Sequence, residues 1–287
     1  YPAKKKIIID YGGANVAKEL HVGHLRSANI GEALKRLSKL LGQEVIGDVH
    51  LGDWGLPMGL VIREIKERMP KLPYFDENYK GEYPTTSPVT AQDLAEIYPT
   101  ASARKKEDET YLKEAQEITA ALQEGNRGYQ ALWKHIVNTS SNDIKKVYDD
   151  LNTHFDLWLG ESDADASIKE VIDIFKKEKL VREDEGALIV DVKEDTDKKE
   201  MPPILLVKSN GGAGYQTTEL ATIYNRMRDY QPDAIWYLAD VRQTLHFEQV
   251  FRASKKAKIT NDAVELEFLP FGTMNGPNGK PFKTRDG

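Results

Sequence analysis

The sequence predicts an α/β fold, built on a parallel sheet that is split by a mainly helical insertion. Short apolar runs alternate with helical patterns near both ends of the chain, an order that is typical of strand–helix–strand units. The middle of the chain instead consists largely of charged amphipathic helical patterns. We therefore expect residues 1–70 and 202–287 to form the two halves of one sheet domain, with a connective insertion at residues 71–201.

The first half begins with the run KIIIDY, whose apolar, β-branched residues end at a Gly-Gly pair, as strands commonly do. A helical pattern of Leu and Ile follows and stops at Gly42. The next apolar run, EVIGDVHL, indicates a second strand, and LPMGLVIREIKERM indicates a second helix that ends before a proline. The expected elements are strands at 6–11 and 44–51 and helices at 25–41 and 56–69.

The insertion opens with prolines, aromatic residues and little periodicity, which predicts an irregular connector at residues 70–100. Charged amphipathic patterns then predict three helices, and two short runs around Asp184, Glu185 and Gly186 predict a hairpin. The alternating pattern resumes at residue 202. The expected elements are helices at 102–124, 127–150 and 166–180, a hairpin at 180–192, a charged loop at 193–200, strands at 202–209, 234–239 and 264–272, and helices at 217–230 and 246–257.

The composition limits what kind of protein this is. The chain has 287 residues, 40% of them hydrophobic, and no cysteine, so we expect a sizeable core without disulfides or a thiolate metal site. Its apolar runs are too short to span a bilayer, and its first residues do not form a secretory signal. We expect a cytoplasmic protein that does not bind membranes. A net charge of −6 argues against a general nucleic-acid coat, although lysines at 4–6 and 255–258 leave room for a local basic path.

The most informative motif is HVGH at residues 21–24, between the first strand and the first helix. Free N–H groups and the positive end of the dipole make such a helix start an anion site. Gly23 lets a phosphate approach the backbone, and His21 and His24 are spaced to share one helix face. The motif is suited to a triphosphate whose negative charge grows during a reaction. For the motif alone, a metal-binding histidine pair and incidental surface histidines remain open.

Six blocks of sequence together give the chain a resemblance to a known family. HVGH after a strand resembles the first signature of class I aminoacyl-tRNA synthetases, and the full set resembles arginyl-tRNA synthetases along most of the chain. The six blocks are ANVAKELHVGHLRS (14–27), HLGDWGLPMGLVI (50–62), FDLWLGESDA (155–164), GGAGYQTTELA (211–221), DVRQTLHFEQVF (240–251) and FGTMNGPNGKPFKTRDG (271–287).

The resemblance implies a Rossmann-like nucleotide-binding catalytic domain. The implied activity is ATP-dependent activation of L-arginine to arginyl-adenylate, with release of pyrophosphate, followed by transfer of arginine to the 3′ end of tRNA(Arg). ATP is then a substrate, Mg²⁺ is expected to accompany it, and the protein is expected to be a monomer. The family carries further domains, commonly one before and one anticodon-binding domain after the core, so we expect this chain to be an isolated catalytic core.

The resemblance also assigns roles to individual residues. His21 and His24 would bind the ATP phosphates and stabilise the transition state, while Gly23 would leave room for the adenosine. An arginine pocket would use carboxylates that face the planar guanidinium and pair with it through two hydrogen bonds. The residues expected to border the nucleotide are Ala14, His246, Phe247 and Gln249, although Phe247 equally suits a helix core. The implied arginine pocket is Asp10, Asn15, Glu161, Tyr215, Glu219 and Gln243, in which Glu219 stands where the family more often has Asp.

The second class I signature is a lysine-rich loop, matched here by GKPFKTR at 279–285 with Thr284 in place of a lysine. The resemblance implies that Lys18, just before HVGH, supplies the missing charge. Lys280, Lys283 and Arg285 would then form a mobile cationic lid, the alternative being a frayed basic chain end.

Three questions stay open on the sequence alone. GDWG at 52–55 suits an active-site turn in which Asp53 faces substrate or RNA, and equally a glycine-bounded turn with a buried Trp54. The chain could be another adenylyltransferase with a His-x-Gly-His helix that acts on a small metabolite. It could also be a synthetase-like binding module without catalysis, although every implied charge-stabilising residue is present. No metal site and no role for His50, His135 or His154 are predicted.

Overall fold

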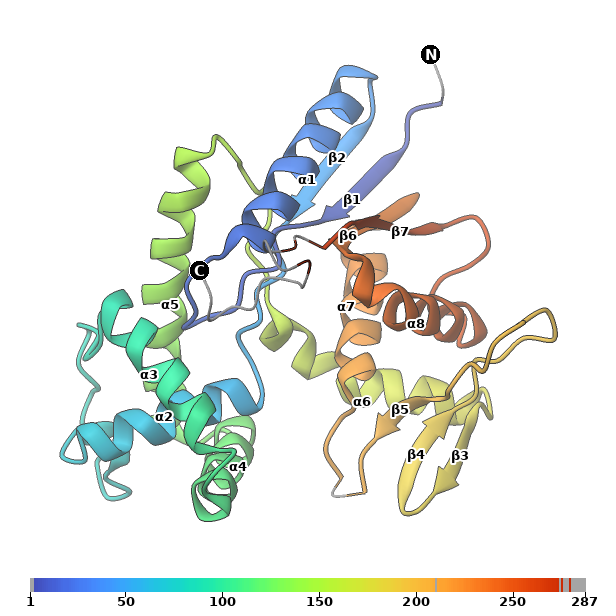
Figure 1. Cartoon of the computed structure of the whole chain (residues 1–287). Helices are drawn as coiled ribbons and strands as arrows, with labels where there is room; N and C mark the ends of the chain where they lie inside the picture. The colour runs from blue at the N-terminus through green and yellow to red at the C-terminus, as the bar shows by residue number, and fades with distance from the viewer. Residues whose placement is uncertain (1–2, 210, 274, 276–278, 280–287) are drawn as a thin grey trace. The chain divides into compact units, whose positions relative to one another are not determined.

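The computed structural model of this chain describes residues 3–209, 211–273, 275 and 279 (Figure 1). The chain divides into two compact units. The sheet unit comprises Tyr1–Gly13, His21–His50 and His154–Gly287, and the helical unit comprises Ala14–Leu20 and Leu51–Thr153. Among the described residues, no helix combines the length and the apolar character that crossing a membrane requires.

A parallel sheet forms the centre of the sheet unit, as the sequence predicts. Its strands lie in the order β2-β1-β6-β7, and every neighbouring pair is parallel. The register places Asp10, at the end of β1, beside Asp48 on one side and Tyr237 on the other. Polar side chains from three strands therefore meet at one edge, where open α/β sheets bind ligands. The bounds are β1 (Lys6–Asp10), β2 (Glu44–Asp48), β6 (Ala234–Asp240) and β7 (Glu265–Phe271).

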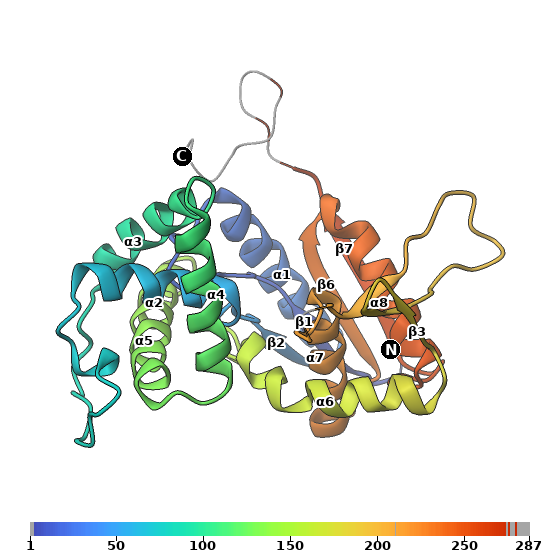
Figure 2. The same cartoon turned by 90° about the horizontal axis from the view of Figure 1, so that it is seen from below.

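Helices cover both faces of this sheet (Figures 1 and 2). On one face Ile7 and Ile9 of β1 pack with Ile30 and Leu34 of α1. On the other face Ile8 belongs to a large cluster with residues of α6, α7 and α8. A continuous apolar run with both faces buried is typical of a central parallel strand. The helices are α1 (Val22–Leu40), α6 (Glu161–Lys177), α7 (Tyr215–Tyr230) and α8 (Thr244–Lys256), with a short 3₁₀ helix η2 (Val241–Gln243) before α8.

A small antiparallel sheet completes the sheet unit. The predicted hairpin is confirmed as β3 and β4, and β5 pairs with β4 in an antiparallel ladder. The sequence indicates that residues 202–209 resume the parallel pattern, but β5 belongs to this second sheet. A short apolar run reports burial and not the direction of its neighbour, so the pattern could not distinguish the two arrangements. The bounds are β3 (Val181–Asp184), β4 (Ala187–Val190) and β5 (Ile204–Val207).

The helical unit packs α2, α3, α4 and α5 around an apolar core. Leu60, Ala101, Tyr111 and Ala115 form a buried cluster in it. The Tyr111 hydroxyl donates a hydrogen bond to Glu64 at 2.8 Å, which satisfies a buried carboxylate. The bounds are α2 (Leu56–Arg68), η1 (Pro73–Phe75), α3 (Ala91–Arg104), α4 (Glu109–Gln123) and α5 (Arg127–Asp150).

The predicted irregular connector through residue 100 and the helix from residue 102 were wrong. Helix α3 occupies 91–104 and contains Pro99, and α4 begins only after Asp108, which caps it. Thr90 and Asp93 form a capping box at the start of α3, a local signal strong enough to begin a helix. Pro99 removes one backbone donor, which a helix tolerates more easily near its surface, where Pro99 lies exposed.

The compact units differ from the expected insertion at 71–201. Helix α2 packs against α3 and α4, so it lies with the helices and not with the sheet. Helix α6 packs against α7, and the small sheet joins the same core, so residues 154–201 lie with the sheet unit.

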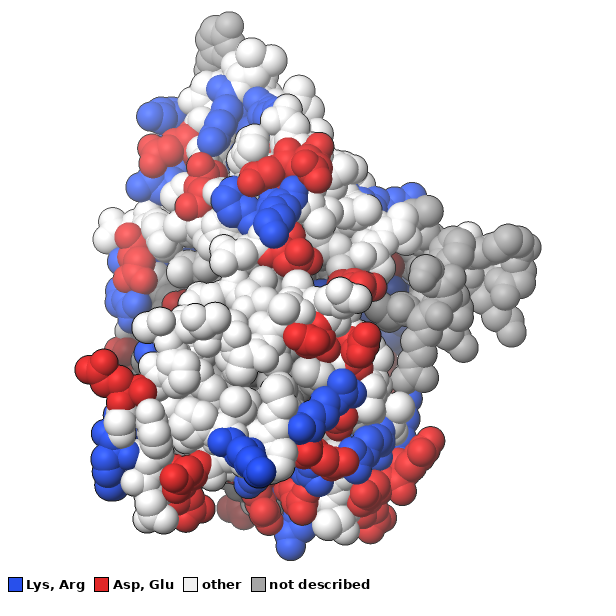
Figure 3. All heavy atoms as spheres, turned by 90° about the vertical axis from the view of Figure 1, so that its left-hand side faces the viewer, with Lys and Arg blue, Asp and Glu red and all other residues white. Residues whose placement is uncertain are grey.

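Charged side chains of both signs are interspersed on the face in Figure 3, around a broad area without charge.

Most of the lysines at 4–6 and 255–258, for which the sequence suggested a local basic path, lie beside an acidic side chain. Lys4 and Lys6 lie near Glu44, Lys5 near Glu265 and Lys258 near Glu178. Because acidic side chains lie beside them, these lysines do not form a continuous basic surface, and an anion would have to bind to individual cations.

Candidate active site

His21 and His24 cap the N-terminus of α1 reciprocally. The Nδ1 of His21 accepts the backbone N–H of Gly23 at 3.1 Å, and the Nδ1 of His24 accepts the backbone N–H of His21 at 3.2 Å. Their ring centroids lie 3.9 Å apart. Because each Nδ1 is an acceptor, each neutral ring carries its proton on Nε2. Two imidazole donors and the positive end of a helix dipole are therefore combined at one helix start.

Gly23 has a packing reason that the sequence did not reveal. A Cβ at this position would lie 2.8 Å from Cε1 and 3.0 Å from Nδ1 of His21. Any side chain would therefore push the His21 ring out of its capping position. The helix itself begins at Val22, three residues before the expected start, because histidine is not among the usual capping residues that mark a helix start.

A buried ion-pair cluster lies at the end of β1. Nη2 of Arg226 on α7 donates to Asp10 Oδ2 at 2.6 Å and to Asp48 Oδ2 at 2.8 Å. Arg226 is 1% exposed and Asp48 is fully buried. Burial raises the pKa of Asp10 against the opposing effect of the Arg226 charge. The candidate arginine-binding carboxylate thus already contacts a guanidinium of the chain.

Several buried polar atoms around this cluster have no hydrogen-bond partner within the described residues. They include Glu219 Oε1, His50 Nδ1 and His246 Nε2. Burial lowers the pKa of His50, but the negative charges of nearby carboxylates, chiefly Asp10 and Glu219, together outweigh this effect. The pKa of His50 is therefore raised. An unpaired buried polar atom costs about 1–3 kcal/mol, and such atoms are typical of a site that a ligand completes.

Tyr215 and Glu161 belong to the same electrostatic cluster. Tyr215 is 60% exposed as a whole, but local desolvation and the charges of Glu219, Glu161 and Asp10 raise its pKa. Its ring centroid lies 4.9 Å from that of His246. Four members of the implied arginine pocket, Asp10, Glu161, Tyr215 and Glu219, are therefore coupled electrostatically.

Among the described residues, Gln243, Phe247 and Gln249 make no hydrogen bond to this cluster. Gln243 is exposed at the start of α8. Phe247 packs in the core and stacks on Phe268, with ring centroids 4.8 Å apart. Gln249 is 5% exposed and donates to the Pro202 carbonyl at 2.7 Å. These contacts give Phe247 and Gln249 structural roles within the fold. For Phe247, this is the helix-core alternative that the sequence left open.

Ala14, Asn15 and Lys18 lie in the helical unit. The Val16 N–H donates to the Gly52 carbonyl at 3.0 Å, and the Gly52 N–H donates to Ala14 at 2.9 Å, so this segment pairs with residues beyond β2. A side chain at Gly52 would overlap Asn15 Oδ1, which explains the glycine. Ala17 has a φ of +63°, a left-handed conformation that costs a residue with a Cβ roughly 1–2 kcal/mol.

The contacts of GDWG favour the structural one of its two readings, with Trp54 half-buried. Asp53 is 4% exposed, and its carbonyl accepts the indole N–H of Trp133 at 2.8 Å. The rings of Trp54 and Trp133 meet edge to face, 5.1 Å apart. Lys280, Lys283 and Arg285 lie outside the described residues.

Sequence reasoning missed His50, Asp48 and Arg226. His50 and Asp48 follow or end β2 at the same sheet edge as Asp10, so strand position could have found them. Nothing local marks Arg226, which lies 216 residues from Asp10. Across the part of the chain that the structure describes, no group of three His, Asp or Glu side chains is arranged to hold a metal.

The fold and the His-x-Gly-His helix start are those of a class I tRNA synthetase. The whole chain, residues 1–287, matches the family described as tRNA synthetases class I (R), catalytic domain, and therefore belongs to it.

The curated relatives and the solved structure that the chain resembles are named as arginyl enzymes. The arginine–tRNA ligase of Alkaliphilus oremlandii is 58% identical over 281 residues, which are 98% of this chain and 48% of the relative. That of Agathobacter rectalis is 56% identical, over 98% of this chain and 47% of the relative. The arginyl-tRNA synthetase of Plasmodium falciparum superimposes with a TM-score of 0.76 at 29% identity, over 94% of this chain and 43% of that one. The chain thus spans about half the length of the curated relatives it matches.

Proposed function

We propose that this chain is the catalytic core of an arginine–tRNA ligase. It would activate L-arginine with ATP and transfer it to the 3′ end of tRNA(Arg). The observation that carries the proposal is the buried carboxylate cluster, with the unpaired Glu219 Oε1, in a chain whose α1 begins with the His21 and His24 donors. One group of residues suits a guanidinium and the other suits phosphates.

In the activation step, a carboxylate oxygen of arginine attacks the α-phosphorus of ATP. A bond forms between that oxygen and phosphorus, and the bond to the bridging oxygen breaks, so that pyrophosphate leaves. Negative charge grows on the phosphate oxygens, where the Nε2–H groups of His21 and His24 and the helix start would stabilise it. Lys18 precedes His21 by three residues, a reach of roughly 10 Å, and would add a positive charge. Mg²⁺ would enter as the complex of ATP, because it commonly binds through substrate phosphates.

The guanidinium would lie against Glu219, whose Oε1 is buried without a partner in the described residues. Glu161 would contribute a further negative charge, Tyr215 a hydroxyl, and Asp10 the carboxylate at the end of β1, whose charges act on Tyr215. Asn15 and Gln243 stay in the proposal on the family resemblance. A monomer in the cytoplasm, with tRNA(Arg) as its acceptor, is also part of the proposal.

The test is arginylation of tRNA(Arg) by a polypeptide of the relatives' full length that carries these residues. His21→Ala and His24→Ala should each lower the rate about 10²–10³-fold, because each removes a donor to developing charge. His135→Ala is the matched control, since His135 contacts the Pro84 carbonyl, 2.9 Å from its Nε2, and the ring of Tyr74, neither of which is an implied site residue. Unchanged rates in both variants would contradict the catalytic assignment. Adenylate formation with another small molecule in place of arginine would instead support the metabolite adenylyltransferase.

A further inference from the structure

We infer that Tyr98 on α3 and Ser140 on α5 are positioning residues that hold Lys18 in the geometry that arginine activation uses. The inference rests on the proposed role of Lys18 at the ATP phosphates. All the contacts that carry it lie within the helical unit. The consequence is that helices of the insertion act on catalysis through one lysine.

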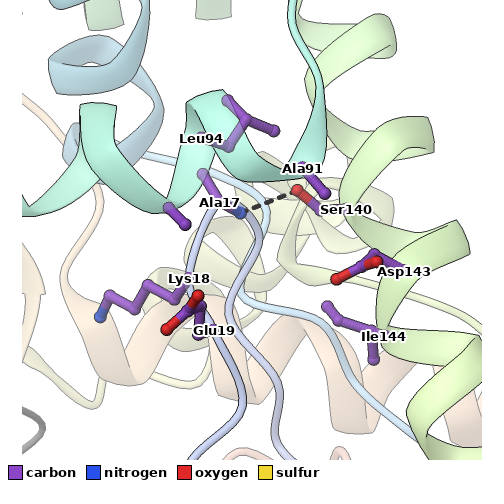
Figure 4. Close-up of a pocket in the computed structure, with 9 residues that line it drawn as sticks. Ala17, Lys18, Glu19, Ala91, Leu94, Ser140, Asp143 and Ile144 are labelled. Carbon is purple, nitrogen blue, oxygen red and sulfur yellow. Dashed lines mark hydrogen bonds between the residues drawn. The ribbon is translucent and has the colours of Figure 1, made fainter.

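The backbone at Lys18 is fixed by a strained turn. The Lys18 N–H donates to the Asn15 carbonyl at 3.3 Å, and Ala17 between them has the left-handed φ of +63°. The Ala17 N–H donates to the buried Ser140 hydroxyl at 2.9 Å, the interaction drawn in Figure 4. Strained backbone persists only where its surroundings hold it, and it gathers at functional sites. Ser140 is the side chain that holds this turn from α5.

Apolar side chains of α3 and α5 line the space beside this turn. A hollow of about 30 Å³ beside Ala17 is lined by Leu94 of α3 and Ile144 of α5, among others. Ala17 itself is 3% exposed. The methyl group of Ala17 packs in this space, although glycine adopts a left-handed conformation at a lower cost. The turn is anchored on two helices at once.

The ammonium of Lys18 is placed by an aromatic ring. Its Nζ lies 4.6 Å from the centroid of the Tyr98 ring. In Figure 4 its side chain extends away from Asp143 of α5. Within the described residues, no carboxylate lies within ion-pair distance of Lys18. A carboxylate partner would neutralise the charge, whereas a ring face orients an ammonium and leaves its charge and N–H donors available to a phosphate.

The test is a double-mutant cycle on arginylation in a polypeptide of the relatives' full length. Lys18→Met should lower kcat about 10²–10³-fold. Tyr98→Leu and Ser140→Ala should each lower kcat about tenfold and leave the KM for arginine unchanged. Tyr98→Phe should stay within about twofold of the parent, because it keeps the ring face. In the Lys18→Met background, Tyr98→Leu should cause no further loss, since the group that it positions is gone.

Each outcome separates the two levels of the proposal. Full activity of Lys18→Met would overturn the proposed role of Lys18. A loss in Lys18→Met together with an equal effect of Tyr98→Leu in both backgrounds would overturn only the positioning inference. Tyr98 is half-buried, so folding is checked by thermal unfolding, with Tyr98→Met as a second variant should Tyr98→Leu unfold. A fall in kcat for Tyr98→Phe as large as for Tyr98→Leu would also contradict the inference.

Discussion

Asp10 is hydrogen-bonded to the guanidinium of Arg226, with 2.6 Å between Asp10 Oδ2 and Arg226 Nη2. The same nitrogen lies 2.8 Å from Oδ2 of Asp48. Asp10 was expected to bind the guanidinium of a substrate, but one of its oxygens already binds a guanidinium of the chain. Glu219 has a buried oxygen without a partner in the described residues, so it is better placed to carry recognition. Arg226 ties together the ends of two neighbouring strands, β1 and β2.

The first prediction concerns the stability that this ion pair provides. Arg226→Met should lower the free energy of unfolding by about 3–5 kcal/mol, because it leaves two buried carboxylates without their cation. Urea denaturation measures the change. Arg228→Met is the control, since Arg228 pairs with Asp229 at the exposed surface and its loss should leave the free energy of unfolding close to that of the parent. Equal small losses in the two variants would show that the buried pair is not needed.

The second prediction concerns the helix start. Gly23→Ala should lower arginylation at least about tenfold, because the new methyl group displaces the His21 ring from its capping position. Steady-state kinetics with tRNA(Arg) measure this, and circular dichroism checks that the total helix content is unchanged. Gly272→Ala is the control, since a methyl group there meets nothing within 4 Å. An unaltered rate for Gly23→Ala would mean that the His21 ring position is unimportant.

The third prediction concerns pH. Burial raises the pKa of Glu32, but hydrogen bonds from Arg36, Lys35 and Tyr11 outweigh this and lower it to about 2, from 4.5. A lowered folded-state pKa gives stability that is present above pH 4.5 and is lost as the pH falls toward 2. The free energy of unfolding should therefore fall by roughly 3 kcal/mol more across this window in the parent than in Glu32→Gln. Parallel curves for the two proteins would contradict it.

The fourth prediction separates the two substrates. Glu219→Gln should weaken L-arginine binding by about tenfold or more, because it removes a charge-assisted partner of the guanidinium, and should leave ATP binding unchanged. Titration calorimetry with each ligand measures both affinities. Glu170→Gln is the control, since Glu170 is exposed and contacts Tyr224 on the surface. Loss of both affinities in Glu219→Gln would indicate misfolding, and loss of neither would remove Glu219 from the pocket.

Much of the sheet unit follows from local patterns. Strands β1 and β6 are apolar runs bounded by turn residues, and the hairpin of β3 and β4 surrounds two residues with positive φ, Glu185 and Gly186. Helix α3 could not be predicted from periodicity because Pro99 interrupts its sequence, although its capping box was visible at Thr90. The membership of β5 in the second sheet depends on tertiary packing, which no short pattern reports.

The candidate site could be predicted where its residues are close together in the sequence. It could not be predicted where folding brings distant residues together. His21, Gly23 and His24 are a single short motif at a helix start. Arg226 lies inside α7 with no special neighbours, and only the packing of α7 on β1 brings it to Asp10. Phe247 shows the converse, since a residue within a recognised block packs in the core.

The central claim is that this chain contains an acidic pocket for the guanidinium of arginine. Calorimetric titration of the chain with L-arginine and with L-citrulline, each with and without ATP, tests it most directly. L-Citrulline has nearly the same shape without the charge, so the difference isolates the charged recognition. We predict that L-arginine binds and that L-citrulline binds at least about tenfold more weakly. Equal affinity for the two amino acids, or binding of ATP without any preference for arginine, would contradict the account.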